Sequence, residues 1–101
     1  MSQKRLYVLI NNELDPIYGC VQAGHAVAQW LIDNKETQTW NNQYLIYLSA
    51  DLNKWKTKLE ILNINHVTFR EPDLNDIPTA IAVEHSGTIF QKLKLVGLRT
   101  S

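Results

Sequence analysis

The residues best suited to chemistry lie at the start of a predicted helix. Tyr18, Gln22 and His25 recur at three- and four-residue spacing in the stretch that begins at Pro16, which places them near one side of the helix. Backbone N–H groups point outward at a helix N-terminus, so uncharged polar side chains there could help to hold an anion or a developing oxyanion. Periodicity alone favours a plainer interpretation, a solvated helix face with a hydrogen-bonded histidine.

A second polar stretch, residues 71–78, carries three carboxylates and two prolines within eight residues. The fixed φ angles of the prolines predict a loop of restricted geometry. Thr79 follows it at the start of a predicted strand. We expect the helix start and this loop to form one cleft, in which side chains from both segments come within reach. These are Gln22 or His25 from the helix, and Glu71, Asp73 or Thr79 from the loop.

Basic residues offer a candidate contact with RNA. Lys54 and Lys58 are four residues apart on a second predicted helix, where they form a small ridge on its outer side. Such a ridge is usually a solvated face, and contact with an RNA backbone is the alternative. Arg70, at the end of a predicted strand, is a further candidate cation.

The helix predicted over residues 16–34 needs one face against a core. Asp15 is placed to cap it, and Pro16 suits its first position. Helical spacing of small and apolar residues predicts a buried face made of Cys20, Gly24, Val27 and Leu31, with Val21 and Ala28 beside them. Gly24 at its centre would let the helix approach a sheet closely, at a cost of about 1 kcal/mol in helix propensity. Cys20 is then either a buried structural thiol, which its position favours, or a catalytic one.

The rest of the chain alternates short apolar runs with one more helix. Strands are predicted over residues 6–10, 43–49, 66–70 and 79–83, and a second helix, capped by Asp51, runs to Leu62. Ser86-Gly87 predicts a turn, residues 88–92 predict one or two helical turns, and residues 93–96 are too short to classify. This order predicts one α/β domain with a mixed four-stranded sheet.

Composition limits the classes of function. The length of 101 residues fits a single core. Ten basic residues balance ten acidic ones, so any RNA site must be a local patch. No apolar run approaches the roughly 20 residues of a membrane span, which predicts no membrane partner. A single cysteine cannot form an intramolecular disulfide, which fits a cytoplasmic location.

Several of these residues together resemble a family. Gln22-Ala23-Gly24-His25-Ala26 resembles the Gln-x-x-His-Ala signature on the first helix of the type 2 peptidyl-tRNA hydrolases. Trp40, followed by Gln43 and an apolar strand, is similar to that family's Trp–Gln–strand junction. Residues 70–73 take the place of its acidic loop, and Thr79-Ala80-Ile81-Ala82 resembles its final strand. The resemblance, which covers nearly the whole chain, implies a cytoplasmic three-layer α/β/α domain with a mixed four-stranded sheet, often a homodimer.

The resemblance also implies an activity, hydrolysis of the ester between a peptide and the 3′ end of tRNA, with neither metal nor cofactor. The family's catalytic candidates are a Lys four residues before the signature Gln, an Asp in the acidic loop and a Thr near the last strand. Here the Lys position is Tyr18 and the Thr is Thr79. Glu71 and Asp73 compete for the Asp, and Pro72, which restrains the neighbouring backbone, favours Asp73.

The candidates for substrate binding are Gln22, His25, Lys54, Lys58 and Arg70. His25 is expected to position other groups and not to act as the general base. Tyr18 brings no fixed charge, and losing one electrostatic stabiliser commonly costs about 10²–10³ in rate. The predicted hydrolase activity is therefore weak or lost. The alternative is a non-catalytic binding protein that uses the same fold and cleft to hold a tRNA end, another nucleotide or a protein partner.

Overall fold

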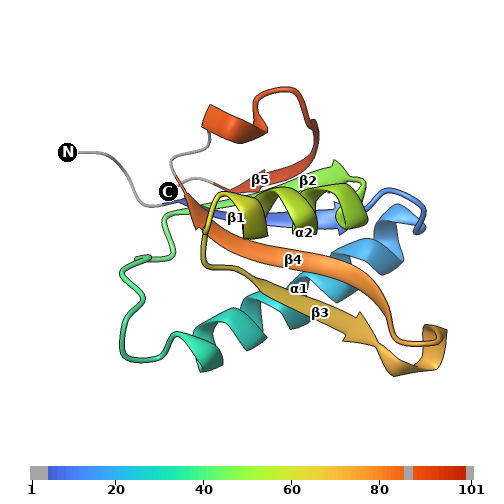
Figure 1. Cartoon of the computed structure of the whole chain (residues 1–101), viewed down its shortest axis with the longest axis horizontal. Helices are drawn as coiled ribbons and strands as arrows, with labels where there is room; N and C mark the ends of the chain where they lie inside the picture. Colours follow the sequence, from blue (N-terminus) through green and yellow to red (C-terminus); the bar gives the residue numbers. More distant parts are fainter. Residues whose placement is uncertain (1–4, 86–87, 100–101) are drawn as a thin grey trace.

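Strands alternate with two helices along the chain (Figure 1). The computed structural model describes residues 5–85 and 88–99, so the turn predicted at Ser86-Gly87 lies outside it. The elements are, in chain order, β1 (Arg5–Asn11), α1 (Pro16–Asp33), β2 (Tyr44–Ala50), α2 (Leu52–Ile61), β3 (Val67–Glu71), the 3₁₀ turn η1 (Pro72–Leu74), β4 (Ile77–His85), the 3₁₀ turn η2 (Thr88–Phe90) and β5 (Lys94–Arg99). Within the described residues, no helix has the length and apolar character to cross a membrane.

Both helices begin where the sequence predicts. The Asp15 carboxylate accepts hydrogen bonds from the backbone N–H of Ile17 at 2.9 Å and of Tyr18 at 3.4 Å. Pro16 follows at the first helical position, where its missing N–H costs nothing. Asp51 caps α2 in the same way through the N–H of Lys54, at 3.3 Å. The two predicted N-caps are confirmed.

The sheet is mixed and has five strands, in the order β3-β4-β1-β2-β5. The central strand β1 runs parallel to β2 and antiparallel to β4, while β3 and β5 lie antiparallel at the two edges. The prediction of four strands is wrong because β5 is a fifth. Leu95 and Leu98 on this edge strand are 53% and 56% exposed, so its sequence carries no pattern of burial that would distinguish it from a loop.

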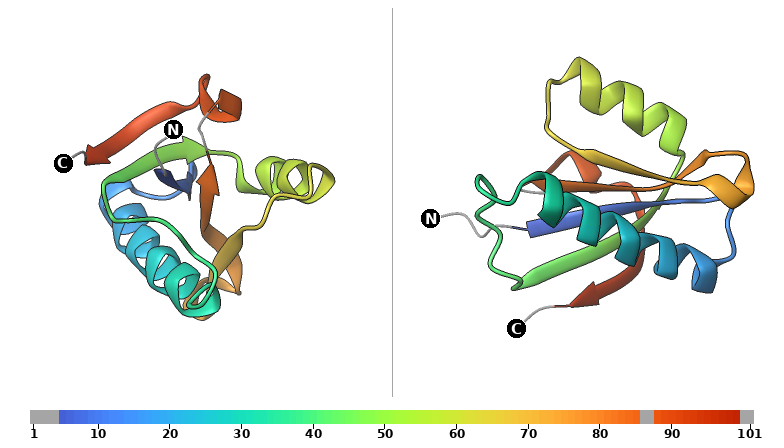
Figure 2. Two further views of the ribbon diagram at one scale, coloured as in Figure 1. Left: turned by 90° about the vertical axis from the view of Figure 1, so that its left-hand side faces the viewer. Right: turned by 90° about the horizontal axis from the view of Figure 1, so that it is seen from below.

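The two helices lie on opposite faces of the sheet (Figures 1 and 2). The face that carries α1 buries Leu6, Val8, Ile10, Ala80 and Ala82 of the sheet with Ala23, Ala26 and Trp30 of the helix. On the other face, α2 and η2 pack over Tyr7, Leu9, Leu48, Ile81 and Val83. The short α2 shares this second face with η2, so the predicted three-layer arrangement is only partly matched. The coarser prediction of one α/β domain is confirmed.

The predicted buried face of α1 is wrong. The helix buries Gly19, Gln22, Ala23, Ala26 and Trp30. Cys20, Gly24 and Leu31 are exposed instead, as is Val21, at 56%. The reason is physical. Ala23 and Ala26 are small, so they let the helix lie close to the sheet. The amide of Gln22 has hydrogen-bond partners in the interior, so this polar residue is buried although the apolar pattern predicts a different face.

Gly19, and not Gly24, is the glycine of close approach. A Cβ at Gly19 would lie 2.6 Å from Cγ2 of Ile10 on β1, whereas a Cβ at Gly24 would meet no atom within 4 Å. Ile10 is only 3% exposed, and its β-branched side chain has little freedom to move aside. The helix start therefore rests directly on the central strand at Gly19.

Two matched substitutions test this rotation of α1. Gly24→Ala should stabilise the fold by about 0.5–1 kcal/mol, since it adds helix propensity in open space. Gly19→Ala makes the same chemical change against Ile10, and overpacking should give a net loss of about 1–2 kcal/mol. The free energy of unfolding in urea measures both. Equal shifts in the two variants, or a loss of stability in Gly24→Ala with a gain in Gly19→Ala, would mean that α1 is rotated from this placement.

Candidate functional site

The amide of Gln22 joins three elements that are distant in sequence. Its Nε2 donates to Oε2 of Glu71, at the end of β3, over 3.2 Å. Its Oε1 accepts from the hydroxyl of Thr79, on β4, at 2.9 Å. Gln22 and Thr79 are 2% and 0% exposed. The prediction that Gln22 lies within side-chain reach of Glu71 and Thr79 is confirmed.

The chemistry of the three groups fixes the direction of these hydrogen bonds. An ionised carboxylate only accepts, so the Gln22 nitrogen must face Glu71 and its oxygen must face Thr79. The Thr79 hydroxyl has one proton, and it lies 2.9 Å from Oε1 of Gln22 and 3.2 Å from the carbonyl oxygen of Phe69. Turning the amide over would set an oxygen against the carboxylate. The charge on Glu71 thus holds the orientation of a buried amide.

Glu71 is also held by the loop that follows it. Its Oε1 accepts from the backbone N–H of Asp73 at 3.4 Å, and its carbonyl oxygen accepts from the N–H of Asp76 at 3.0 Å. Asn75 and Asp76 adopt left-handed conformations, with φ of 57° and 61°, which Asn and Asp tolerate better than most residues. The loop therefore folds back on Glu71 and leaves this carboxylate half-buried at the surface.

The Glu71 carboxylate is held in place by hydrogen bonds, whereas the carboxylate of Asp73, the acidic residue that Pro72 favours, is exposed. The Glu71 carboxylate accepts hydrogen bonds from the Gln22 amide and from the backbone N–H of Asp73. Thr79 is completely buried, so it acts on Glu71 only through Gln22. Among the predicted catalytic residues, Glu71, Asp73 and Tyr18 are the ones that reach the surface.

Tyr18 is close enough to Glu71 and Asp73 for both negative charges to act on its phenol. Partial desolvation raises the pKa of its phenol above the ordinary value, and the negative charges of Glu71 and Asp73 raise it further. The phenol therefore keeps its proton and stays a hydrogen-bond donor. It supplies the site with a donor but with no positive charge.

The start of α1 cannot serve as the predicted anion or oxyanion site. Pro16 has no N–H, and the N–H groups of Ile17 and Tyr18 already bind the Asp15 carboxylate. The N–H of Gly19 bonds to the carbonyl oxygen of Asp15 at 2.8 Å. These donors of the first turn are satisfied by the cap, and the cap itself is negative.

His25 forms the outer border of the site. Its exposed ring stacks on Phe69 of β3, with centroids 4.8 Å apart and planes 8° from parallel. Phe69 also supplies the carbonyl near Thr79. The ring thus lies at the edge of the site, and the expected roles of His25 in positioning and in binding stay predictions.

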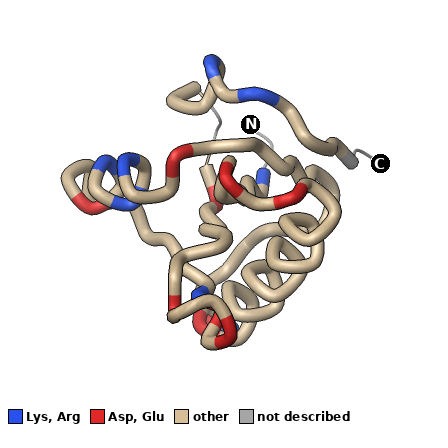
Figure 3. Tube along the Cα trace, turned by 90° about the vertical axis from the view of Figure 1, so that its right-hand side faces the viewer, with Lys and Arg blue, Asp and Glu red and all other residues tan. Residues whose placement is uncertain are grey.

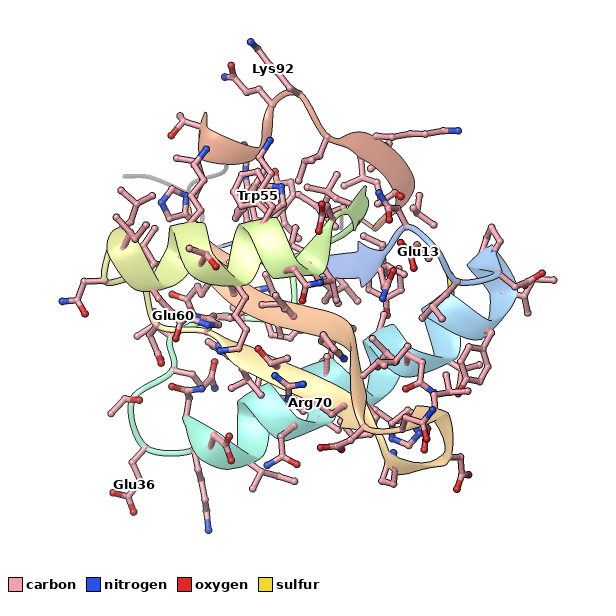
Figure 4. The ribbon with its side chains drawn as sticks, turned by 45° about the vertical axis from the view of Figure 1, so that its right-hand side comes forward. Glu13, Glu36, Trp55, Glu60, Arg70 and Lys92 are labelled. Atoms are coloured by element: carbon pink, nitrogen blue, oxygen red, sulfur yellow. The ribbon has the colours of Figure 1, made fainter. Side chains whose placement is uncertain are left out.

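The predicted basic residues are not brought to this site. Lys54 and Lys58 belong to α2, which packs on the sheet face opposite α1. Arg70 lies next to Glu71 in sequence but on the side of β3 that faces away from α1 (Figure 4), and its Nη1 donates to the carbonyl oxygen of Asp76 at 3.2 Å. A continuous strip of cations leading to Glu71 is therefore not present among the described residues.

The surroundings of the site are acidic. Figure 3 shows that Asp and Glu gather at this end of the molecule, on the β1–α1 loop, at the start of α2 and on the β3–β4 loop. Beside the site, Glu13 and Asp51 line a small pocket of about 150 Å³ together with Ile77 and Pro78. The field at this end repels phosphate groups and attracts cations.

Sequence reasoning missed Asn11. Its Nδ2 donates to the carbonyl oxygen of Pro78 at 3.0 Å, which ties the end of β1 to the start of β4, one residue before Thr79. The only signal for it in the sequence is an Asn directly after a buried strand, and many turns share that feature.

Comparisons with known proteins do not extend the resemblance. Neither known protein families, nor curated protein sequences, nor solved structures give a match to this chain. Within the described ranges, no three His, Cys, Asp or Glu side chains are placed to hold a metal ion. The evidence for the site is therefore the geometry of its residues.

The raised pKa of Tyr18 gives a prediction for alkaline pH. The folded state binds the phenolic proton more tightly than the unfolded chain, so the stability due to this group is complete below the ordinary pKa of 10.0 and declines as the pH rises above it. The difference between the ultraviolet titrations of the wild type and Tyr18→Phe isolates this phenol. In a Glu71→Gln Asp73→Asn background its midpoint should fall toward the ordinary value.

Asp33→Asn is the control for this titration, since it removes a carboxylate from the far end of α1. It should leave the Tyr18 midpoint unchanged. The same midpoint in all three backgrounds would contradict the placement of Glu71 and Asp73 beside the phenol.

Proposed function

We propose that this chain is a peptidyl-tRNA hydrolase-like protein of low activity, in which the Glu71 carboxylate is the general base. The observation that carries the proposal is the Thr79–Gln22–Glu71 chain of hydrogen bonds, which orients one surface carboxylate from inside the protein. Ester hydrolysis without a metal needs a base to activate water, and a carboxylate whose geometry is fixed suits that task.

Tyr18 is the second group in this mechanism. Its phenol keeps its proton, lies beside Glu71 and can donate a hydrogen bond to the oxygen on which charge develops. Glu71 takes a proton from water, the hydroxyl oxygen attacks the ester carbonyl, and the bond to the ribose oxygen breaks. The proton then passes from the Glu71 carboxyl group to the departing ribose oxygen.

Low activity follows from what surrounds these two groups. A neutral phenol stabilises an oxyanion less than a cation would, and the first-turn N–H groups of α1 are occupied by Asp15. The acidic residues at this end of the molecule also repel the phosphates of a tRNA end. Each effect weakens either substrate binding or transition-state stabilisation.

The acidic surroundings favour a second candidate, a non-catalytic protein that binds a cationic partner at the same surface. Such a partner would gain attraction from Glu13, Asp51, Glu71 and Asp73, with no requirement for an aligned base. This candidate predicts binding of a lysine-rich peptide that weakens with salt, together with no ester hydrolysis.

Release of peptide from peptidyl-tRNA by the purified protein tests the proposal. Glu71→Gln should lower kcat/KM by at least about 10²-fold, since it removes the base. Asp73→Asn is the matched neutralisation two residues away, and its effect should stay below about fivefold because Asp73 is exposed and not oriented. Asp76→Asn controls for the loss of one negative charge from the loop.

The outcomes separate the two candidates. An inactive wild type that binds the lysine-rich peptide would replace the hydrolase with the binding protein. A hydrolase in which Asp73→Asn is more damaging than Glu71→Gln would give the role of base to Asp73.

A further inference from the structure

A groove on the opposite face of the sheet carries cations on both walls. It has a volume of about 500 Å³ and lies between α2 and the segment that runs from η2 toward β5. Lys54 and Lys58 line one wall, and Lys92 lines the other. The polar lining is completed by Thr88 and Gln91. We call this feature, made of these five residues, the lysine groove.

Aromatic packing fixes the two walls relative to each other. Phe90 of η2 is 2% exposed, and its ring packs against Trp55 of α2 at 5.2 Å and against Tyr7 of β1 at 4.7 Å. Lys92 follows two residues later, on the turn beyond η2, and its side chain extends into solvent at the rim (Figure 4). The groove is thus a fixed feature of the fold with lysine side chains along both walls.

The lysines of the groove have no acidic partners among the described residues. The ion pair of α2 joins Lys56 to Glu60, over 3.4 Å. Lys58 instead lies over the ring of Trp55, 4.6 Å from its centroid, and the lining contains no carboxylate. In a chain of zero net charge, this leaves local positive charge to attract an anion.

We propose that the lysine groove binds a ligand with neighbouring phosphate groups. Lys54 and Lys58 are separated by four residues of helix, or about 6 Å along its axis, so each can contact a different phosphate, while Lys92 adds a positive charge at the rim of the other wall. The Thr88 hydroxyl and the Gln91 amide add neutral hydrogen-bond donors. This site is separate from Glu71, and the proposal does not depend on the hydrolysis proposed above.

Binding measurements with two probes test the proposal and distinguish its two sources of phosphate. The probes are a short single-stranded RNA and inorganic tripolyphosphate, each titrated into the full chain at about 50 mM salt. Lys54→Gln, Lys58→Gln and Lys92→Gln should each weaken binding of the preferred probe about two- to fivefold, and binding should weaken as salt is added. Lys56→Gln, which removes the same charge from the other side of α2, should leave binding within about twofold.

Each outcome supports or overturns the proposal that the lysine groove binds phosphate groups. Binding of the RNA alone identifies a nucleic-acid strand as the source of phosphate, and binding of tripolyphosphate identifies a small polyphosphate compound. Binding of neither probe overturns the proposal. An effect of Lys54→Gln and Lys58→Gln without one of Lys92→Gln also overturns it, since the helix alone would then bind the anion. The proposal is also overturned if Lys56→Gln weakens binding as much as the substitutions in the groove do.

Discussion

The buried amide of Gln22 is the constraint on which the site depends. An amide removed from water must keep its hydrogen bonds, or it costs the fold a large fraction of its stability. Its partners are Thr79 on one strand and Glu71 at the end of the next, so α1 can lie on the sheet in only one rotation. The close contact of Gly19 with Ile10 and the outward direction of Val21 follow from the same rotation.

The fold separates charges that balance in the sequence. The loops that meet beside Glu71 carry acidic residues, whereas the lysines of α2 and Lys92 lie around a groove on the other face of the sheet. Net charge therefore says little about what either surface attracts. The carboxylate site is suited to proton transfer or to a cationic partner, and the lysine groove to phosphate. The sign of the ligand that each surface attracts depends on its local field.

Sequence reasoning found the helix caps, four of the strands and the meeting of Gln22 with Glu71 and Thr79. The predictions are wrong where a polar residue is buried or an apolar residue is exposed. Helical spacing predicts Gln22 on the polar face because an isolated glutamine prefers water, but its two partners are residues 49 and 57 positions away. Cys20 and Leu31 fit an apolar stripe, yet tertiary packing places them outside. The edge strand β5 exposes its leucines and leaves no periodic pattern to detect.

A double-mutant cycle between Gln22 and Thr79 tests the central claim most directly. Thr79→Val removes the hydroxyl at nearly constant shape and leaves the Gln22 oxygen without its donor. The free energy of unfolding in urea should therefore fall by about 1–3 kcal/mol. In a Gln22→Leu background the amide oxygen is absent, so the same change removes only the longer contact of the hydroxyl with the Phe69 carbonyl oxygen and should cost no more than about 0.5 kcal/mol. An equal cost in both backgrounds would contradict the network, because Thr79 would then stabilise the fold without Gln22.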